Sequence, residues 1–280
     1  MQITGKPPWL KVPIPSGENY SSLIRLIREN NIHTICQEAR CPNIAECFSK
    51  KTATFLILGD TCTRSCRYCN VKTGKPGKLD GKEPKKVANA VKMLGLKYIV
   101  LTSPARDDLK DGGARTFIET MKQIKKMDTK IKIELLTPGF REQIRNILKY
   151  GPDVFGHNIE TVKRLFPEMR PQADYLKSIL FLKQIKEFNP SQTTKSGLMV
   201  GLGETEEEVI ETLKDLKKAK VDIVTIGQYL QPRKDLAGVK KYYTPEDFKR
   251  FEEIGERLGF KGVFSAPLVR SSYHAEELIK

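Results

Sequence analysis

The chain lacks any long apolar run. No stretch of its 280 residues approaches the roughly 20 consecutive apolar residues that a membrane-spanning helix needs. Residues 1–20 contain no apolar segment that could form the core of a signal peptide. We therefore expect a cytoplasmic protein that is neither secreted nor membrane-bound. With 39% hydrophobic and 30% charged residues, and no internal repeat or low-complexity segment, the composition is that of a globular protein.

Tryptophan and histidine are scarce. Single-stranded nucleic acid is bound on surfaces that combine aromatic and basic side chains. The single Trp and the nine Tyr are instead spread along the chain, which argues against such a surface. The three histidines, His33, His157 and His274, have no spacing suited to metal ligation, so we leave them out of metal sites. A zinc-stabilised nucleic-acid-binding protein is kept as the alternative from another class.

Basic residues are in excess. The 49 Lys and Arg exceed the 34 Asp and Glu, giving a net charge of +15 and a pI near 9.5. The electrostatic field of a protein with this net positive charge attracts acidic partners, which include nucleic acid, anionic lipid and acidic proteins. The bases recur through the chain on expected helix faces, so a solvated lysine-rich surface explains them as well as a dedicated patch does.

Cysteine is absent after residue 69, and all six cysteines lie in two groups before that point. A disulfide framework is typical of short secreted chains, which this is not. Structural zinc needs four ligands, usually as two close pairs, although six cysteines around two zinc ions remain an alternative. An iron–sulfur cubane takes one thiolate per iron, so three cysteines leave one iron open for catalysis. Spacing favours iron–sulfur for the first trio, Cys36, Cys41 and Cys47, and the second trio, Cys62, Cys66 and Cys69.

Strand-like and helix-like segments alternate after residue 53. The expected strands are 54–58, 98–101, 131–136, 153–156, 197–202, 223–229 and 262–264. The expected helices are 84–95, 113–127, 140–149, 172–188, 205–219 and 245–258. Helix-separated strands imply parallel pairing, and six such units fall short of the eight in a closed barrel. We predict an open, partial α/β barrel, with a doubly wound sheet as the alternative.

Several polar residues follow expected strand ends. The second trio follows the first strand, Thr102 and Ser103 the second, and Asn158 and Glu160 the fourth. In parallel α/β folds, the carboxyl ends of the strands build the active site. We therefore expect these residues at one functional site.

The second trio, with Tyr68 before its last cysteine, resembles the signature of radical S-adenosylmethionine (SAM) enzymes. Combined with the first trio, the resemblance narrows to the lipoyl synthase family and covers nearly the whole chain. The supporting segments are KPPWLK (6–11), TATFLILGDTCTRSCRYCNV (52–71), RDDLKDGGA (106–114), HNIETV (157–162), SGLMVGLGET (196–205), IGQYLQP (226–232) and RSSYHA (270–275). Departures from the expected pattern are Pro104-Ala105, Asn70 and Arg233, and none removes a cluster ligand. The alternative within the superfamily is another sulfur-inserting radical SAM enzyme, similar to biotin synthase. The first trio and the RSSY segment argue against this alternative.

The resemblance implies a radical SAM partial (β/α)6 barrel at 54–261. An N-terminal extension, 1–53, carries the first trio, and a C-terminal extension, 262–280, carries RSSY. It also implies a sulfurtransferase of lipoate biosynthesis. SAM, cleaved by one electron from a [4Fe-4S] cluster, yields a radical that takes hydrogen from C6 and C8 of an octanoyl chain on a carrier-protein lysine. A second [4Fe-4S] cluster donates the sulfur, and two SAM molecules are used for each lipoyl group.

Residue roles follow from the same resemblance. The second trio would hold the radical SAM cluster, and the first trio with Ser272 would hold the sulfur-donating auxiliary cluster. Arg270 would counter the charge of that cluster, and Ser271 is the less favoured serine. The remaining expected SAM contacts are Tyr68, Thr102, Ser103, Asn158, Glu160 and Arg170. A carboxylate suits ribose hydroxyls or an ammonium group, and an arginine suits a carboxylate.

Implied partners are octanoylated lipoyl carrier domains, namely the 2-oxoacid dehydrogenase E2 component and the glycine cleavage H protein. A flavodoxin or ferredoxin would deliver the electrons. The net charge of +15 would steer such acidic proteins toward the enzyme. We expect neither a nucleic-acid nor a membrane partner.

Overall fold

The computed structural model describes residues 5–12, 18–29, 32–49 and 53–273. These divide into two compact units, and each is described by itself. The N-terminal unit contains residues 18–29, 32–49, 53–64 and 71–155, and the C-terminal unit contains residues 5–12, 65–70 and 156–273. The chain thus passes from one unit to the other within the second trio. Of the quoted motifs, residues 52, 274 and 275 lie outside the described residues.

A mainly parallel sheet forms the centre of the N-terminal unit. Its strand order is β1 (His33–Thr34), β2 (Thr54–Leu56), β5 (Tyr98–Thr102), β6 (Lys132–Leu136) and β7 (Val154–Gly156), whose last residue begins the C-terminal unit. Strand β1 pairs antiparallel with β2, while β2, β5 and β6 are parallel. Two short strands, β3 (Thr61–Cys62) and β4 (Lys72–Thr73), pair separately.

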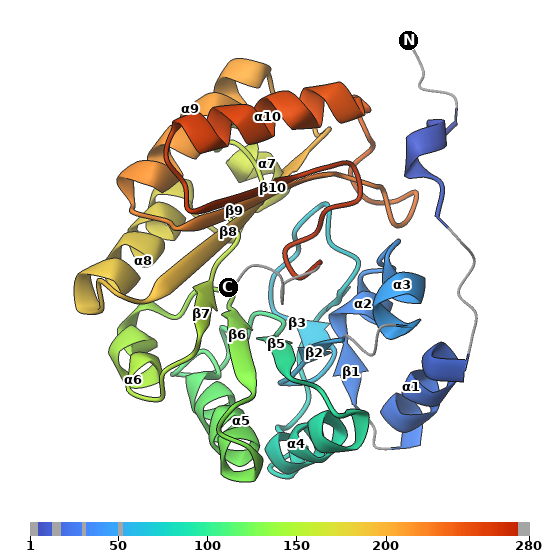
Figure 1. Cartoon of the computed structure of the whole chain (residues 1–280), viewed down its shortest axis with the longest axis vertical. Coiled ribbons are helices and arrows are strands. Elements are labelled where there is room, and N and C mark those ends of the chain that lie inside the picture. The colour runs from blue at the N-terminus through green and yellow to red at the C-terminus, as the bar shows by residue number, and fades with distance from the viewer. Residues whose placement is uncertain (1–4, 13–17, 30–31, 50–52, 274–280) are drawn as a thin grey trace. The chain divides into compact units, whose positions relative to one another are not determined.

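Helices of the N-terminal unit flank its strands. Helices α4 and α5 lie on the outer side of β5 and β6 (Figure 1). Leu58, which precedes the loop of the second trio, is buried, as are the core strands. The loop therefore begins at a fixed point. The helices are α1 (Glu18–Glu29), α2 (Ile35–Glu38), α3 (Ile44–Ser49), α4 (Glu83–Leu94), α5 (Ala114–Met127), η2 (Arg141–Gln143) and α6 (Ile144–Leu148).

The C-terminal unit has its own parallel strands, β8 (Thr193–Val200), β9 (Ile223–Gln228) and β10 (Gly262–Ser265). Helices α8, α9 and α10 cover one side of these strands (Figure 1). Leu198, Val224 and Leu213 are among the buried residues of the apolar core that joins the two layers. The helices are η1 (Pro8–Leu10), η3 (Lys163–Leu165), α7 (Phe166–Met169), α8 (Tyr175–Phe188), α9 (Glu206–Lys218) and α10 (Pro245–Arg257).

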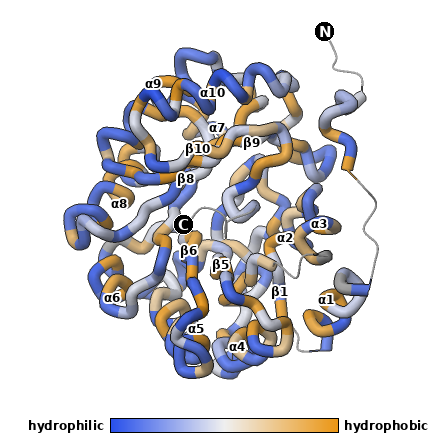
Figure 2. Tube along the Cα trace, in the orientation of Figure 1, coloured by the Kyte–Doolittle hydropathy of each residue, from blue (hydrophilic) through white to orange (hydrophobic). Residues whose placement is uncertain are grey.

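Local sequence fixes where the surface helices begin. The expected capping box of α9 is confirmed, since the Thr205 hydroxyl accepts from the Glu208 N–H and the Glu208 carboxylate accepts from the Thr205 N–H. Acidic residues fill the first turn of α9 and lysines its last turn, which complements the helix dipole. Figure 2 shows hydrophilic residues alternating with hydrophobic ones along α9 and α10, as amphipathic helices require. No helix among the described residues is both long and apolar enough to cross a bilayer.

The expected start of one strand is wrong. The sequence predicts a strand from residue 197, but β8 begins at Thr193. Residues 193–196 are polar, so their pattern does not indicate a buried strand. Thr194, Lys195 and Ser196 are buried nonetheless because internal partners satisfy polar groups there: Thr194 donates to Asp222, and Ser196 accepts from the Ile159 N–H.

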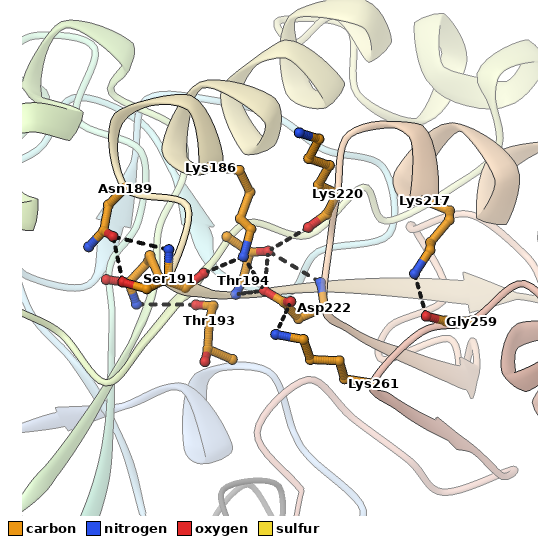
Figure 3. Close-up of polar contacts among 11 residues, drawn as sticks. Lys186, Asn189, Ser191, Thr193, Thr194, Lys217, Lys220, Asp222, Gly259 and Lys261 are labelled. Atoms are coloured by element: carbon orange, nitrogen blue, oxygen red, sulfur yellow. Dashed lines mark hydrogen bonds and ion pairs between the residues drawn. The ribbon is translucent and has the colours of Figure 1, made fainter.

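An ion network centred on the buried Asp222 ties α8 to the starts of β9 and β10 (Figure 3). The Asp222 carboxylate accepts from Lys186 at 2.9 Å, from Lys261 at 2.8 Å and from the Thr194 N–H at 2.9 Å. Burial by itself would raise the pKa of Asp222, but these donors outweigh it and lower the pKa below 3.8. The ionised carboxylate therefore stabilises the fold above the unfolded-state pKa, and this contribution is lost as pH falls through the lower folded-state pKa.

We predict that Asp222→Asn lowers the free energy of unfolding by about 3–5 kcal/mol at neutral pH, because it leaves the Lys186 ammonium buried without its counter-charge. Urea unfolding followed by circular dichroism measures the change. Asp235→Asn is the control, since Asp235 forms an exposed ion pair with Arg233 and should matter little. Equal unfolding curves for the two variants would contradict the role given to Asp222.

Candidate active site

The first trio lies in one small apolar cluster of the N-terminal unit. Cys36, Cys41 and Cys47 all pack in the cluster that includes Leu23 and Phe48. The Cys41 N–H donates to the Cys36 carbonyl at 3.0 Å, so the two thiols lie on one tight turn. Burial and the neighbouring Cys41 raise the pKa of the Cys36 thiol to about 12. A protein thiol held in this way ionises only when a cation compensates, as coordination to a metal does.

The thiols are chemically available as ligands. All six cysteines are free of disulfides. Among the described residues, no three Cys, His, Asp or Glu side chains gather around one metal-ion position. A cubane places each cysteine on a different iron, so its ligands stand further apart than those of one ion. Cysteine thiolates are the ligands that such a cubane takes, so the residue types of the first trio fit one.

Cys62, the first cysteine of the second trio, belongs to the N-terminal unit. Its Sγ accepts hydrogen bonds from the Arg64 N–H and the Ala105 N–H, both at 3.3 Å. The departure Pro104-Ala105 is therefore harmless at this point, because a backbone N–H makes the contact. These two donors fix the direction of the sulfur.

Asp107 holds the loop that carries Cys62. Its carboxylate accepts two hydrogen bonds from the Arg64 guanidinium, at 2.7 and 2.9 Å, and one from the Thr63 hydroxyl at 2.8 Å. The Arg64 hydrogen bond, with help from Thr63, lowers the pKa of Asp107 against the effect of burial. Sequence reasoning noted the RDDL segment but assigned it no role. The pairing spans more than 40 residues, so no local pattern could reveal it.

Cys66 and Cys69 belong to the C-terminal unit, where they form a turn with the Cys69 N–H donating to the Cys66 carbonyl at 3.1 Å. Arg67 anchors this turn on both sides, since its N–H donates to Met169 and its carbonyl accepts from Ala237. Reciprocal hydrogen bonds also join Ser65 and Gln172.

A charged cluster surrounds Tyr68 in the same unit. Burial raises the pKa of Tyr68 well above 10 and also raises the pKa of Glu160, although Arg170 and Asn158 partly oppose the latter shift. Arg170 is buried and donates to the Asn158 carbonyl at 3.2 Å. Glu160 has a φ of 72°, a conformation that costs a non-glycine residue energy and is often found at functional sites. Hydrogen bonds to Gly197 and from Met199 hold it there.

Three expected SAM contacts have buried polar atoms without a hydrogen-bond partner among the described residues. They are Asn158 Oδ1 and Arg170 Nε in the C-terminal unit, and Ser103 Oγ in the N-terminal unit. Buried polar atoms are nearly always paired, so in each unit such an atom suits a polar ligand. SAM carries a carboxylate, an ammonium group and ribose hydroxyls, which match a guanidinium and hydrogen-bonding oxygens. Thr102 is buried at the end of β5, and its carbonyl accepts from Ile57.

The RSSY segment approaches these residues within the C-terminal unit. Asn158 donates to the Ser271 hydroxyl at 2.6 Å, while Arg270 donates to the Val269 carbonyl at 2.7 Å. Ser272 makes no side-chain hydrogen bond among the described residues, so its hydroxyl is available as a ligand. Two glycines permit the approach: a Cβ on Gly227 would collide with the Val269 carbonyl oxygen, and one on Gly197 would lie 2.7 Å from Ser271 Oγ.

The chain is similar to known proteins along its whole length. The model of the radical SAM superfamily matches residues 56–216, and the model of the N-terminal domain of lipoyl synthase matches residues 3–41. The chain is 52% identical to lipoyl synthase of Caldicellulosiruptor saccharolyticus over 100% of this chain and 99% of the relative. It is 50% identical to lipoyl synthase of Rubrobacter xylanophilus, over 98% and 86%. The chain belongs to the lipoyl synthase family.

Solved structures confirm the fold class. Methylornithine synthase (PylB) aligns with a TM-score of 0.58 at 16% identity, over 94% of this chain and 85% of that one. The Streptococcus suis protein SuiB, in a crystal structure with S-adenosylmethionine, aligns at 0.58 and 14%, over 89% of this chain and 56% of that one. The fold is thus the predicted radical SAM type, a partial α/β barrel.

Membership confirms the expected activity class. Members of the lipoyl synthase family are radical SAM enzymes that insert sulfur into an octanoylated protein, with SAM and a [4Fe-4S] cluster as cofactors. The two alternatives raised by the sequence, a nucleic-acid-binding protein and a different sulfur-inserting enzyme, are not supported. The individual site residues and the three-part division at 53 and 261 stay predictions.

We predict that Gly197→Ala weakens SAM binding to the iron-loaded protein about tenfold, because the new Cβ would displace Asn158 and Ser271 from their hydrogen bond. Anaerobic titration calorimetry measures the affinity. Hydrogen exchange of residues 266–273 should also become faster. Gly238→Ala is the matched control, since its Cβ meets no atom within 4 Å. If both variants bind SAM like the unaltered protein, the contact has no role in the site.

Proposed function

We propose that the chain forms the lipoyl group by inserting two sulfur atoms, at C6 and C8 of an octanoyl-lysine, with two separate [4Fe-4S] clusters. The second trio would bind the radical SAM cluster, and the first trio with Ser272 would bind the auxiliary cluster whose sulfur is consumed. Two groups of three cysteines without disulfide bonds, in a chain that belongs to this family, support the proposal. When bound, the radical SAM cluster and SAM supply the one-electron chemistry that removes hydrogen from unactivated carbon.

The residues around the second trio would orient its ligands. The Arg64 and Ala105 N–H groups hold the Cys62 sulfur, and Asp107 fixes the loop through Arg64. Hydrogen bonds to ligating sulfur also tune the reduction potential of an iron–sulfur centre. This loop would therefore set both the position and the potential of the site.

The charged cluster in the C-terminal unit would bind SAM. Arg170 suits the carboxylate of the methionyl part, while Asn158 and Glu160 suit its ammonium group or the ribose hydroxyls. Tyr68 would pack beside them, and Thr102 and Ser103 would contribute from the end of β5. The unpartnered atoms Asn158 Oδ1, Arg170 Nε and Ser103 Oγ support these assignments.

Ser272 would complete the ligand set of the auxiliary cluster. A hard alkoxide is a weaker ligand for iron than thiolate, which suits an iron that must leave as sulfur is donated. Arg270 would balance the charge of the cluster. Ser271 is engaged by Asn158, which supports the choice of Ser272.

Partners and location complete the proposal. The octanoyl chain would be presented by lipoyl domains of the 2-oxoacid dehydrogenase E2 component and by the glycine cleavage H protein. Electrons would come from a flavodoxin or ferredoxin. We place the enzyme in the cytoplasm, since ligating thiolates need the reducing conditions that prevail there.

We predict that Cys41→Ala spares SAM cleavage and abolishes lipoyl formation, whereas Cys66→Ala abolishes both, because only the second trio would serve SAM. Mass spectrometry of an octanoyl-lysyl peptide, incubated anaerobically with SAM and dithionite, measures 5′-deoxyadenosine and the thiolated products. Iron analysis of each variant should show about four irons, as one remaining cubane requires. Loss of SAM cleavage in Cys41→Ala, with that iron content intact, would refute the division between the trios.

A further inference from the structure

An exposed run of lysines follows the second trio. Residues 72–86 contain six lysines and two acids. Neither acid offsets the exposed charge, because Asp80 pairs with Lys86 at 2.8 Å and Glu83 turns inward to accept from the Leu58 N–H at 2.8 Å. The remaining lysines are exposed and form no ion pair among the described residues. We call them the lysine strip: Lys72, Lys75, Lys78, Lys82 and Lys85.

The backbone of the lysine strip is fixed. The Gly74 N–H donates to the Cys62 carbonyl at 3.0 Å, and the Thr73 hydroxyl donates to the Arg64 carbonyl at 3.1 Å. Further along, the buried guanidinium of Arg106 donates to the Gly77 carbonyl at 3.3 Å. The strip is therefore a shaped surface of the N-terminal unit.

The lysine strip adjoins Cys62, a proposed ligand of the radical SAM cluster. Strand β4 pairs with β3 in the register Thr61 with Lys72 and Cys62 with Thr73. Paired strands lie about 4.8 Å apart, so the strip begins one strand away from Cys62. Leu79, 44% exposed, adds an apolar contact within the basic surface, a combination typical of protein–protein interfaces.

We propose that the lysine strip is the docking surface for an acidic one-electron carrier protein that bears a flavin or an iron–sulfur group. The proposal rests on the proposed function of the second trio. The carrier is oxidised by one electron, the cluster at Cys62 is reduced by one, and the oxidised carrier dissociates. Charge attraction accelerates encounter and brings the carrier to the side of the molecule where Cys62 lies.

The octanoylated lipoyl domain is the other acidic candidate for this surface. Its octanoyl chain has to reach both the SAM bound at the second trio and the sulfur held by the first trio, whereas the strip lies beside Cys62, a ligand of the radical SAM cluster alone. Electron delivery needs only proximity to that cluster. The position of the strip thus favours the electron carrier.

The test compares two charge-reversal variants with equal changes in net charge. One carries Lys75→Glu, Lys78→Glu and Lys85→Glu in the strip. The matched control carries Lys126→Glu, Lys214→Glu and Lys249→Glu, which are exposed lysines on α5, α9 and α10. Anaerobic calorimetry at low salt measures the Kd of each iron-loaded protein for a purified acidic flavodoxin and, separately, for an octanoylated lipoyl domain.

We expect the strip variant to bind the flavodoxin at least tenfold more weakly than the control, with the difference shrinking as salt rises toward 0.5 M, where the Debye length is only about 4 Å. Equal affinities for the flavodoxin, or a selective loss of lipoyl-domain binding, would overturn the proposal. Turnover of the unaltered protein with dithionite tests the proposed function independently, since it needs no carrier protein. Iron content and circular dichroism confirm that both variants are folded and loaded.

Discussion

The two hydrogen bonds that the Cys62 sulfur receives from the Arg64 and Ala105 N–H groups are the constraint on which the rest of the site depends. Of the eight residues in the loop that carries the second trio, Tyr68 packs against an apolar core. The part of the loop around Cys62 is polar, so its geometry has to come from polar contacts. Asp107 supplies them through Arg64 and Thr63. The same loop pairs with β4, which couples the position of the sulfur to that of the lysine strip.

The C-terminal unit combines a strained backbone conformation at Glu160 with neighbouring charged side chains. Glu160 adopts a left-handed backbone conformation, and burial raises its pKa beside the buried Arg170. Buried charges and strained residues destabilise a fold unless the surroundings hold them, and they concentrate at functional sites. Here β8 holds Glu160 through backbone bonds on both sides, and Gly197 leaves the space that Asn158 and Ser271 occupy. Ligand recognition and the placement of the RSSY segment therefore depend on the same few residues.

Much of the fold could be predicted from the sequence because periodicity and capping are local. The alternating elements after residue 53 and the Thr205–Glu208 capping box are confirmed. The start of β8 was missed because polar residues there are satisfied by distant partners such as Asp222. The hydrogen bonds of Asp107 to Arg64 and Thr63, and the one between Asn158 and Ser271, also join residues that are distant in the sequence. Asn158 and Ser271, for example, stand 113 residues apart, so no local pattern predicts their contact. Cysteine spacing, by contrast, is visible in the sequence, which is why both trios were found without a structure.

The two trios are proposed to hold two separate cubanes with different fates. Mössbauer spectroscopy of the anaerobic, iron-57-loaded protein before and after a single turnover tests it most directly. The account predicts about eight irons per chain in two [4Fe-4S] clusters, with the signal of only one cluster lost as lipoyl product accumulates. Bound zinc, about four irons at full loading, or equal loss of both signals would contradict it.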